Sequence, residues 1–172
     1  MIERLNKLAR VEAEAEFLKC CGSMKWAEEM ASARPFENFQ ELSVKADSIW
    51  WGLDETDWLE AFSHHPKIGE RKGALAQDAQ ARAWSSEEQS GTRKSSEELL
   101  AELAELNHAY ERKFGYIYIV CASGKTTEEM LETLRERLRN DPQTEIRIAA
   151  EEQRKITQLR LKKLLKSLES GV

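Results

Sequence analysis

The sequence predicts an all-α fold: a single-domain helical bundle over residues 1–172, with one short extended segment near residues 116–123. Helix-favouring residues dominate, whereas the chain has only 8 glycines and 3 prolines. Apolar residues recur at spacings of three and four through most of the chain, which is the helical period. A length of 172 residues suits one domain with a substantial core and would be short for two.

The first half of the chain predicts four helices. Residues 11–21 form the first, which ends before a glycine, and residues 24–33 form the second, between a serine cap and a proline. Residues 38–51 carry apolar side chains along one stripe. Asp54 then caps a fourth helix over residues 55–65.

Residues 67–95 interrupt this pattern with three glycines and many small polar residues. We therefore expect a loop with short helical turns, and a loop of this length is usually functional or disordered. The long helix that follows has leucines at helical spacing, and Gly115 ends it.

Residues 116–123, YIYIVCAS, are rich in β-branched and aromatic side chains, so they predict a buried extended connection without a partner strand. Two helices complete the chain. Thr126 and Glu129 form a capping box for the first, which ends at Asn140, and the last covers about residues 145–168.

Composition excludes several classes of function. The net charge is −5 and basic residues are interspersed with acidic ones, which argues against a nucleic-acid surface. No apolar run approaches the roughly 20 residues that cross a bilayer, and the N-terminus does not resemble a signal peptide. Cys20, Cys21 and Cys121 lack metal-site spacing, so we expect reduced thiols, an intracellular protein and no metal.

The sequence FSHHPKIGE places two of the three histidines of the chain at a helix end. Either imidazole could simply interact favourably with the helix C-terminus. Pro66 favours His65 over His64 as the functional residue, because proline holds the preceding residue in an extended conformation beside the loop. A histidine there can exchange a proton near neutral pH.

The sequence WSSEEQ offers a second candidate. Ser85 and Glu88 have the spacing of a capping box, so a purely structural role is as probable as a functional one. In the functional interpretation, the N–H groups of the turn bind a polar ligand, Glu88 exchanges a proton and Gln89 offers its amide.

Two further candidates lie later in the chain. The backbone of the extended segment needs hydrogen-bond partners, and a flat ligand rich in amide groups could supply some of them. Cys121 within it is more often an inert buried residue than a reactive one. Arg160 lies at the edge of an apolar stripe: most such arginines reach water, but an inward one would suit a carboxylate.

Together, WLEAFSHHPKIGE, WSSEEQ and the long stretch from LNHAYERKFGYIYIVCAS to RKITQLRLKKL resemble the 2-oxo-4-hydroxy-4-carboxy-5-ureidoimidazoline (OHCU) decarboxylase family. The resemblance covers about residues 11–166. CCGSMKWAEEMASARPF and CASGKTTEEML are most similar to the decarboxylase domain of plant-type allantoin synthase. Departures are HPKIGE, where many members have HPDLAG, and a longer interval between His65 and Glu88 than in animal members.

The resemblance implies an all-helical, cofactor-independent carboxy-lyase of urate degradation that converts OHCU to (S)-allantoin. It assigns catalysis to His65 and Glu88, with His65 the expected proton donor. The substrate contacts that it implies are Pro66, Ser85, Gln89, Tyr118, Ile119, Val120, Cys121, Ala122 and Arg160.

The resemblance also implies possible partners: a second copy in a homodimer, and a hydroxyisourate hydrolase that is either fused or separate. We expect a cytoplasmic protein, or a peroxisomal one if a eukaryotic relative carries a targeting signal that is missing here. The alternative is a non-catalytic helical interaction module, whose partner surface would consist of exposed Trp50, Trp51 and Trp58.

Overall fold

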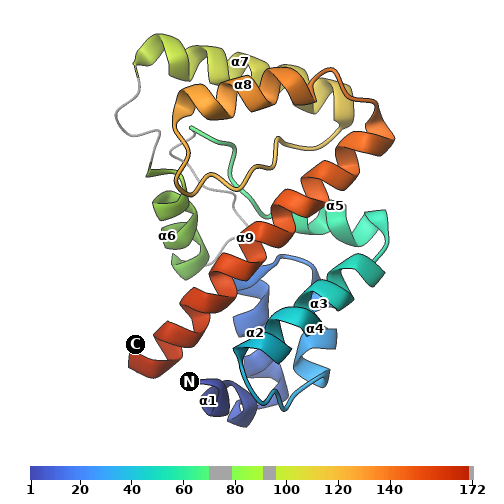
Figure 1. The fold of residues 1–172 in the computed structure, drawn as a ribbon, viewed down its shortest axis with the longest axis vertical. Helices are drawn as coiled ribbons and strands as arrows, with labels where there is room; N and C mark the ends of the chain where they lie inside the picture. Colours follow the sequence, from blue (N-terminus) through green and yellow to red (C-terminus); the bar gives the residue numbers. More distant parts are fainter. Residues whose placement is uncertain (70–78, 91–95, 171–172) are drawn as a thin grey trace. The chain divides into compact units, whose positions relative to one another are not determined.

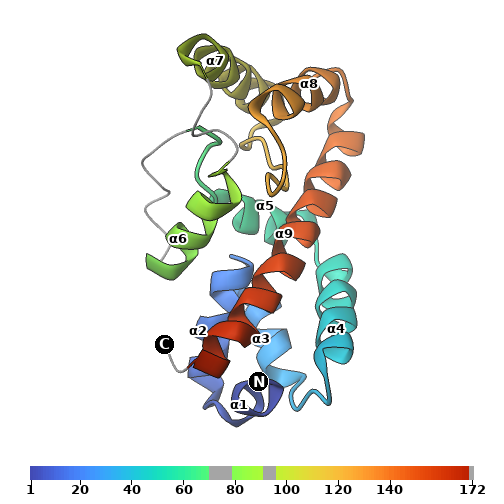
Figure 2. The same ribbon diagram turned by 60° about the vertical axis from the view of Figure 1, so that its left-hand side comes forward.

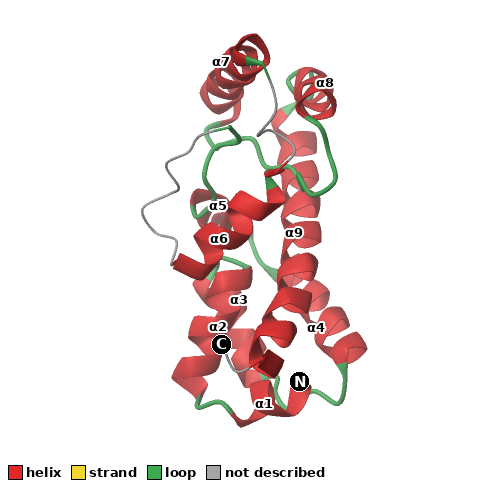
Figure 3. Ribbon diagram, turned by 90° about the vertical axis from the view of Figure 1, so that its left-hand side faces the viewer, coloured by secondary structure: helices red, strands yellow, loops and turns green. Residues whose placement is uncertain are grey.

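The computed structural model describes residues 1–69, 79–90 and 96–170. Its regular structure is helical, and the described ranges contain no strand, which confirms the all-α prediction (Figures 1 and 3). No helix within these ranges is both long enough and apolar enough to cross a membrane.

The chain divides into two compact units. Unit 1 comprises Met1–Ala61 and Arg154–Val172, and unit 2 comprises Phe62–Gln153, so the division falls inside helices α5 (Glu55–Ser63) and α9 (Pro142–Ser170). Besides parts of these two helices, unit 1 contains α1 (Ile2–Lys7), α2 (Arg10–Cys20), α3 (Met24–Ser32) and α4 (Phe39–Gly52). Unit 2 adds α6 (Ala79–Glu88), α7 (Glu97–Phe114) and α8 (Thr127–Arg137).

Tryptophans fill the core of unit 1. The Trp26 side chain is fully buried, and its indole N–H donates to the carbonyl of Ala46 at 3.1 Å. Trp58 donates in the same way to the carbonyl of Trp50 at 3.0 Å, and both side chains are buried. Only Trp51 of the proposed partner surface is exposed, so the prediction of an exposed tryptophan surface is wrong for Trp50 and Trp58.

Unit 2 has α7 and α8 side by side, with the extended segment passing next to them (Figures 1 and 2). Gly115 ends α7 in a left-handed conformation with φ of 84°, as predicted. Thr126 and Glu129 form the predicted capping box of α8: the Glu129 N–H donates to Oγ1 of Thr126, and the Thr126 N–H donates to Oε2 of Glu129.

Several predicted boundaries differ from the structure, among them the end of α8, which lies at Arg137 and not at Asn140. Part of the expected loop over residues 67–95 is α6, a ten-residue helix. Helix α5 ends at Ser63, because Pro66 disfavours helical backbone just before it. Helix α9 begins at Pro142, since proline fits the first helical position and Asp141 accepts a hydrogen bond from the Thr144 N–H at 2.9 Å. Helix α1 had no counterpart in the prediction.

The predicted extended segment is confirmed, and a buried arginine holds it in place. Arg137, the last residue of α8, donates from Nη1 to the carbonyl of Ile119 at 2.6 Å. Its guanidinium lies 4.8 Å from the ring centre of Tyr118. The described ranges contain no strand that could pair with this backbone, and the guanidinium supplies one of the hydrogen bonds that the buried segment requires.

Glu145 completes this arrangement. Its Oε1 accepts from Arg137 Nε at 2.6 Å and from the Tyr110 hydroxyl at 2.6 Å, while Oε2 accepts from Asn140 at 2.9 Å. The side chains of Arg137 and Glu145 are 5% and 0% exposed, so neither charge can be solvated if its partner is lost. Burial also raises the pKa of Tyr110, which keeps its hydroxyl a donor.

We predict that Arg137→Ala lowers the free energy of unfolding by about 3–5 kcal/mol, because Glu145 is left as an uncompensated buried charge. Urea unfolding followed by far-ultraviolet circular dichroism measures this loss. Arg139→Ala, at an exposed position two residues later, is the matched control and changes the stability little. Equal losses in the two variants would contradict the role of the ion pair.

Candidate active site

His65 lies just beyond the end of α5, in unit 2. Its backbone N–H donates to the carbonyl of Phe62 at 3.2 Å, and its ring is half-buried. The ring Nε2 is 2.6 Å from Oε1 of Gln153 on α9. Helix end, proline and glutamine together fix both the backbone and the ring of His65.

The residues after His65 are anchored to α7. Lys67 forms an ion pair with Glu111 at 2.8 Å. Ile68 is buried in the core of unit 2, and its carbonyl accepts from Asn107 Nδ2 at 3.3 Å. The lysine and isoleucine of HPKIGE therefore secure the loop, a role that the sequence comparison with HPDLAG did not indicate.

Gly69 completes the turn with φ of 85°. Its N–H donates to Oε1 of Gln89 at 3.1 Å, which joins the loop to the end of α6. A side chain at this position would be strained by the left-handed backbone.

Helix α6 carries the WSSEEQ residues, and here one interpretation is wrong. Ser85 was expected to cap a helix beginning at WSSEEQ, but α6 starts six residues earlier, at Ala79. The Ser85 carbonyl instead accepts the Gln89 N–H at 3.1 Å, so this turn has no helix N-terminus for a ligand. Ser85 and Glu88 are both buried, with Glu88 8% exposed in the last turn of α6.

The extended segment forms a further part of the same unit. The Tyr118 side chain belongs to the core, where its hydroxyl donates to the carbonyl of Met130 at 3.1 Å. The Cys121 N–H donates to Oε1 of Glu152 at 3.3 Å, and Lys125 lies 3.5 Å from the same oxygen. Val120 and Ala122 are buried in the core cluster. The backbone hydrogen bonds observed here thus reach protein groups on α8 and α9.

Two adjacent residues of α9 connect these parts. Gln153 contacts His65 and Glu152 contacts Cys121, and both side chains are buried. Neither residue was predicted from the sequence. A signal was present for Gln153, which stands in the apolar stripe of α9, four residues after Ala149 and three before Ile156.

Arg160 belongs to unit 1. It is 3% exposed, so of the two alternatives left open the inward one is observed, and its Nη1 donates to the carbonyl of Lys19 at 3.3 Å. It is not among the side chains that unit 2 brings together, and its contact with substrate stays a prediction.

The thiols have raised pKa values. Burial raises the pKa of Cys21 to about 12 and that of Cys20 further in the same direction. Burial also raises the pKa of Cys121, and the carboxylates of Glu152 and Glu88 add to this, while Lys125 opposes it. None of the three thiols suits a nucleophile at neutral pH.

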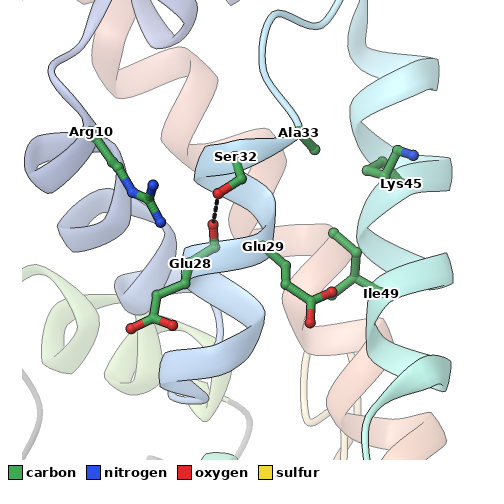
Figure 4. Close-up of a pocket in the computed structure, with 7 residues that line it drawn as sticks. All are labelled: Arg10, Glu28, Glu29, Ser32, Ala33, Lys45 and Ile49. Atoms are coloured by element: carbon green, nitrogen blue, oxygen red, sulfur yellow. Dashed lines mark hydrogen bonds between the residues drawn. The ribbon is translucent and has the colours of Figure 1, made fainter.

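The described part of the chain holds no cluster of three or more potential metal ligands among its His, Cys, Asp and Glu side chains. A shallow depression of about 460 Å³ lies in unit 1, between α2, α3 and α4 (Figure 4). None of the predicted site residues lines it. The lining residues are Arg10, Glu28, Glu29, Ser32, Ala33, Lys45 and Ile49.

Comparison with known proteins supplies the family. The family model described as OHCU decarboxylase matches residues 6–162. The chain belongs to the OHCU decarboxylase family. The matched residues belong to both structural units of this OHCU decarboxylase family member. They include every site residue that was predicted from the sequence.

Individual relatives agree with this family membership. The uric acid degradation bifunctional protein of Arabidopsis thaliana is 45% identical over 152 residues, which is 88% of this chain and 47% of the relative. The bifunctional protein of a Bacillus strain is 30% identical over 98% of this chain, but that covers only 33% of the relative. The chain thus spans half or less of the length of these two relatives. The OHCU decarboxylase of Amia calva is 31% identical over 78% of this chain and 76% of the relative.

Solved structures confirm the fold. A crystal structure of OHCU decarboxylase in the presence of (S)-allantoin matches with a TM-score of 0.76 and 43% identity, over 88% of this chain and 97% of that one. An (S)-allantoin synthase structure matches with a TM-score of 0.70 over 95% of this chain and 54% of that one; at 19% identity it supports the fold alone.

We predict that Glu152→Gln lowers the pKa of Cys121 and so speeds its alkylation by iodoacetamide at pH 8, because a charge that opposes the thiolate is removed while an acceptor for the Cys121 N–H remains. Peptide mass spectrometry measures the modified fraction of each cysteine over time. Glu128→Gln, at an exposed position on α8, is the control. An unchanged Cys121 rate in Glu152→Gln would show that the two groups are not close.

Proposed function

We propose that the chain catalyses decarboxylation of OHCU to (S)-allantoin, with His65 and Glu88 as the proton-transfer residues. The single observation that carries this proposal is the gathering of the HP turn, the end of α6 and the extended segment within one unit of an OHCU decarboxylase family member. The Gly69–Gln89 and His65–Gln153 hydrogen bonds support it by tying these segments to each other and to α9.

The chemistry that these residues must support follows from the substrate. One carbon of OHCU bears a hydroxyl and a carboxylate, and the neighbouring carbon is an imine carbon that bears the ureido group. When the bond to the carboxylate breaks, carbon dioxide leaves and the electron pair enters the adjacent carbon–nitrogen double-bond system. The former imine nitrogen takes up a proton, the hydroxyl gives up its proton to become a carbonyl, and the ureido-bearing carbon gains a proton. The balance is one carbon dioxide released and one proton consumed.

Two side chains with separate proton-transfer tasks fit these reaction steps. His65 donates the proton to the ureido-bearing carbon, and the face from which it does so sets the S configuration. Glu88, buried at the end of α6, accepts the proton of the hydroxyl. General acid–base catalysis of this kind contributes roughly 10²–10⁴-fold to a rate. Gln89 and the backbone of residues 118–122 bind the ureido and ring amides.

The bifunctional relatives support a further proposal about partners. A hydroxyisourate hydrolase, fused or separate, supplies OHCU to this chain. If so, (S)-allantoin should accumulate faster when the two activities are mixed than with the hydrolase alone. A coupled assay that adds such a hydrolase and measures (S)-allantoin tests this pairing.

We predict that His65→Ala lowers kcat by roughly 10²–10⁴-fold and that Glu88→Gln has an effect of similar size, because each variant removes one proton-transfer group. Freshly prepared OHCU is supplied, and circular dichroism follows (S)-allantoin. Protonation in water has no facial preference, so the uncatalysed product gives no signal.

His64→Ala and Glu87→Gln are the matched controls, since each changes the neighbouring residue of the same type. Both should keep nearly full activity. Near wild-type turnover in His65→Ala would contradict the assignment of His65 as a proton-transfer residue. A loss confined to His64→Ala would assign that role to His64 instead.

A further inference from the structure

Gln153 is fully buried on α9, and its Oε1 lies 2.6 Å from Nε2 of His65. A glutamine carbonyl oxygen accepts hydrogen bonds and cannot donate them. With the Gln153 amide in this orientation, the His65 nitrogen that faces it carries a hydrogen, whether the ring is neutral or protonated. In a neutral imidazole only one nitrogen carries a hydrogen, so the other nitrogen, Nδ1, is the one with the lone pair.

We propose that Gln153 is a positioning residue that holds His65 as the Nε2–H tautomer, so that Nδ1 is the ring nitrogen that exchanges protons with the substrate. The catalytic part of this inference, proton exchange between Nδ1 and the substrate, rests on the proposed function. Its structural part, the tautomer, stands on the contact alone.

The amide suits this role in both states of the reaction. When Nδ1 gains a proton, Nε2 still carries its hydrogen, so the bond to Gln153 persists through the catalytic cycle. A carboxylate in the same place would accept the same bond but would also favour the imidazolium, and so would weaken His65 as a proton donor. Gln153 accepts the bond without adding a charge.

Gln153 lies in a buried stretch of α9. Ala149 and Ala150, in the preceding turn of α9, are fully buried. The charged residues on either side of Gln153 are engaged with partners: Glu152 with Lys125 and the Cys121 N–H, and Arg154 with Asp47. A fixed amide is a better orienting group than a mobile one, because less conformational entropy is lost with each hydrogen bond.

Two substitutions of similar size separate orientation from packing. Gln153→Met retains the length and volume of the side chain but removes the acceptor, and Gln153→Glu retains the acceptor but adds a charge. For a side chain that only fills space in the core, Met is tolerated and a buried carboxylate is disruptive. For a side chain that orients His65, Glu is tolerated better than Met, because only Glu retains the acceptor.

The tautomer can be read directly, because the chain has only three histidines. Two-dimensional ¹H–¹⁵N spectra that correlate ring carbon-bound hydrogens with ring nitrogens distinguish protonated from unprotonated nitrogens. His64→Gln, His65→Gln and His108→Gln assign the signals. We expect the Nε2–H form of neutral His65 in the wild type and in Gln153→Glu, and a mixture of tautomers in Gln153→Met.

Kinetics with OHCU supply the second readout. Gln153→Met should lower kcat about 10–100-fold, the range seen when the hydrogen-bond partners of metal-ligating histidines are removed. Gln153→Glu should keep more activity than Gln153→Met. In the pH profile of kcat/KM for Gln153→Glu, the limb that reports the titration of His65 should move to higher pH by about one unit or more, because a carboxylate favours the imidazolium. Far-ultraviolet circular dichroism checks that both variants fold.

An Nδ1–H tautomer in the wild type would overturn the inference whatever the activity, and so would a folded Gln153→Met that matches the wild type in kcat. Absence of OHCU turnover in the wild type would instead overturn the proposed function, and with it the catalytic part of the inference, while the spectra would still decide the tautomer. A folded Gln153→Glu with less activity than Gln153→Met would assign the residue to packing.

Discussion

The buried guanidinium of Arg137 is the interaction on which unit 2 depends. An extended segment inside a helical protein has no ladder of backbone partners, and every unsatisfied buried carbonyl costs free energy. Arg137 donates to Ile119, stacks near Tyr118 and is balanced by Glu145. The end of α8, the start of α9 and residues 118–122 thereby become one assembly, because the same pair of charges touches all three.

The positions of the candidate active-site residues depend on that assembly. Glu145 and the pair Glu152 and Gln153 belong to one continuous helix, so fixing its beginning also fixes the direction in which the later side chains point. His65 is oriented from one side by this helix and from the other by a proline and by a loop anchored to α7. The ring of His65 is therefore held by Gln153, while the residues that follow it are held by α7.

Much of this could be predicted from the sequence, and the failures have physical reasons. The helices, the capping box at Thr126 and the extended segment depend on local preferences, which a short stretch of sequence displays. The error at Ser85 arose because the same S-x-x-E spacing also occurs within a helix, where the upstream turn already supplies the hydrogen bonds. Gln153, Glu152 and Arg137 act on residues 88, 31 and 18 positions away, and no local pattern encodes such pairings.

The adjacency of Glu152 and Gln153 has a consequence for how this family can change. Successive residues of a helix differ by about 100° in direction and 1.5 Å in height. A one-residue insertion or deletion between Glu145 and Glu152 would rotate both side chains together, away from Cys121 and His65 at once. The length of this stretch of α9 is thus constrained as strictly as the identity of its residues, and evolutionary change in it is expected to proceed by substitution rather than by gaps.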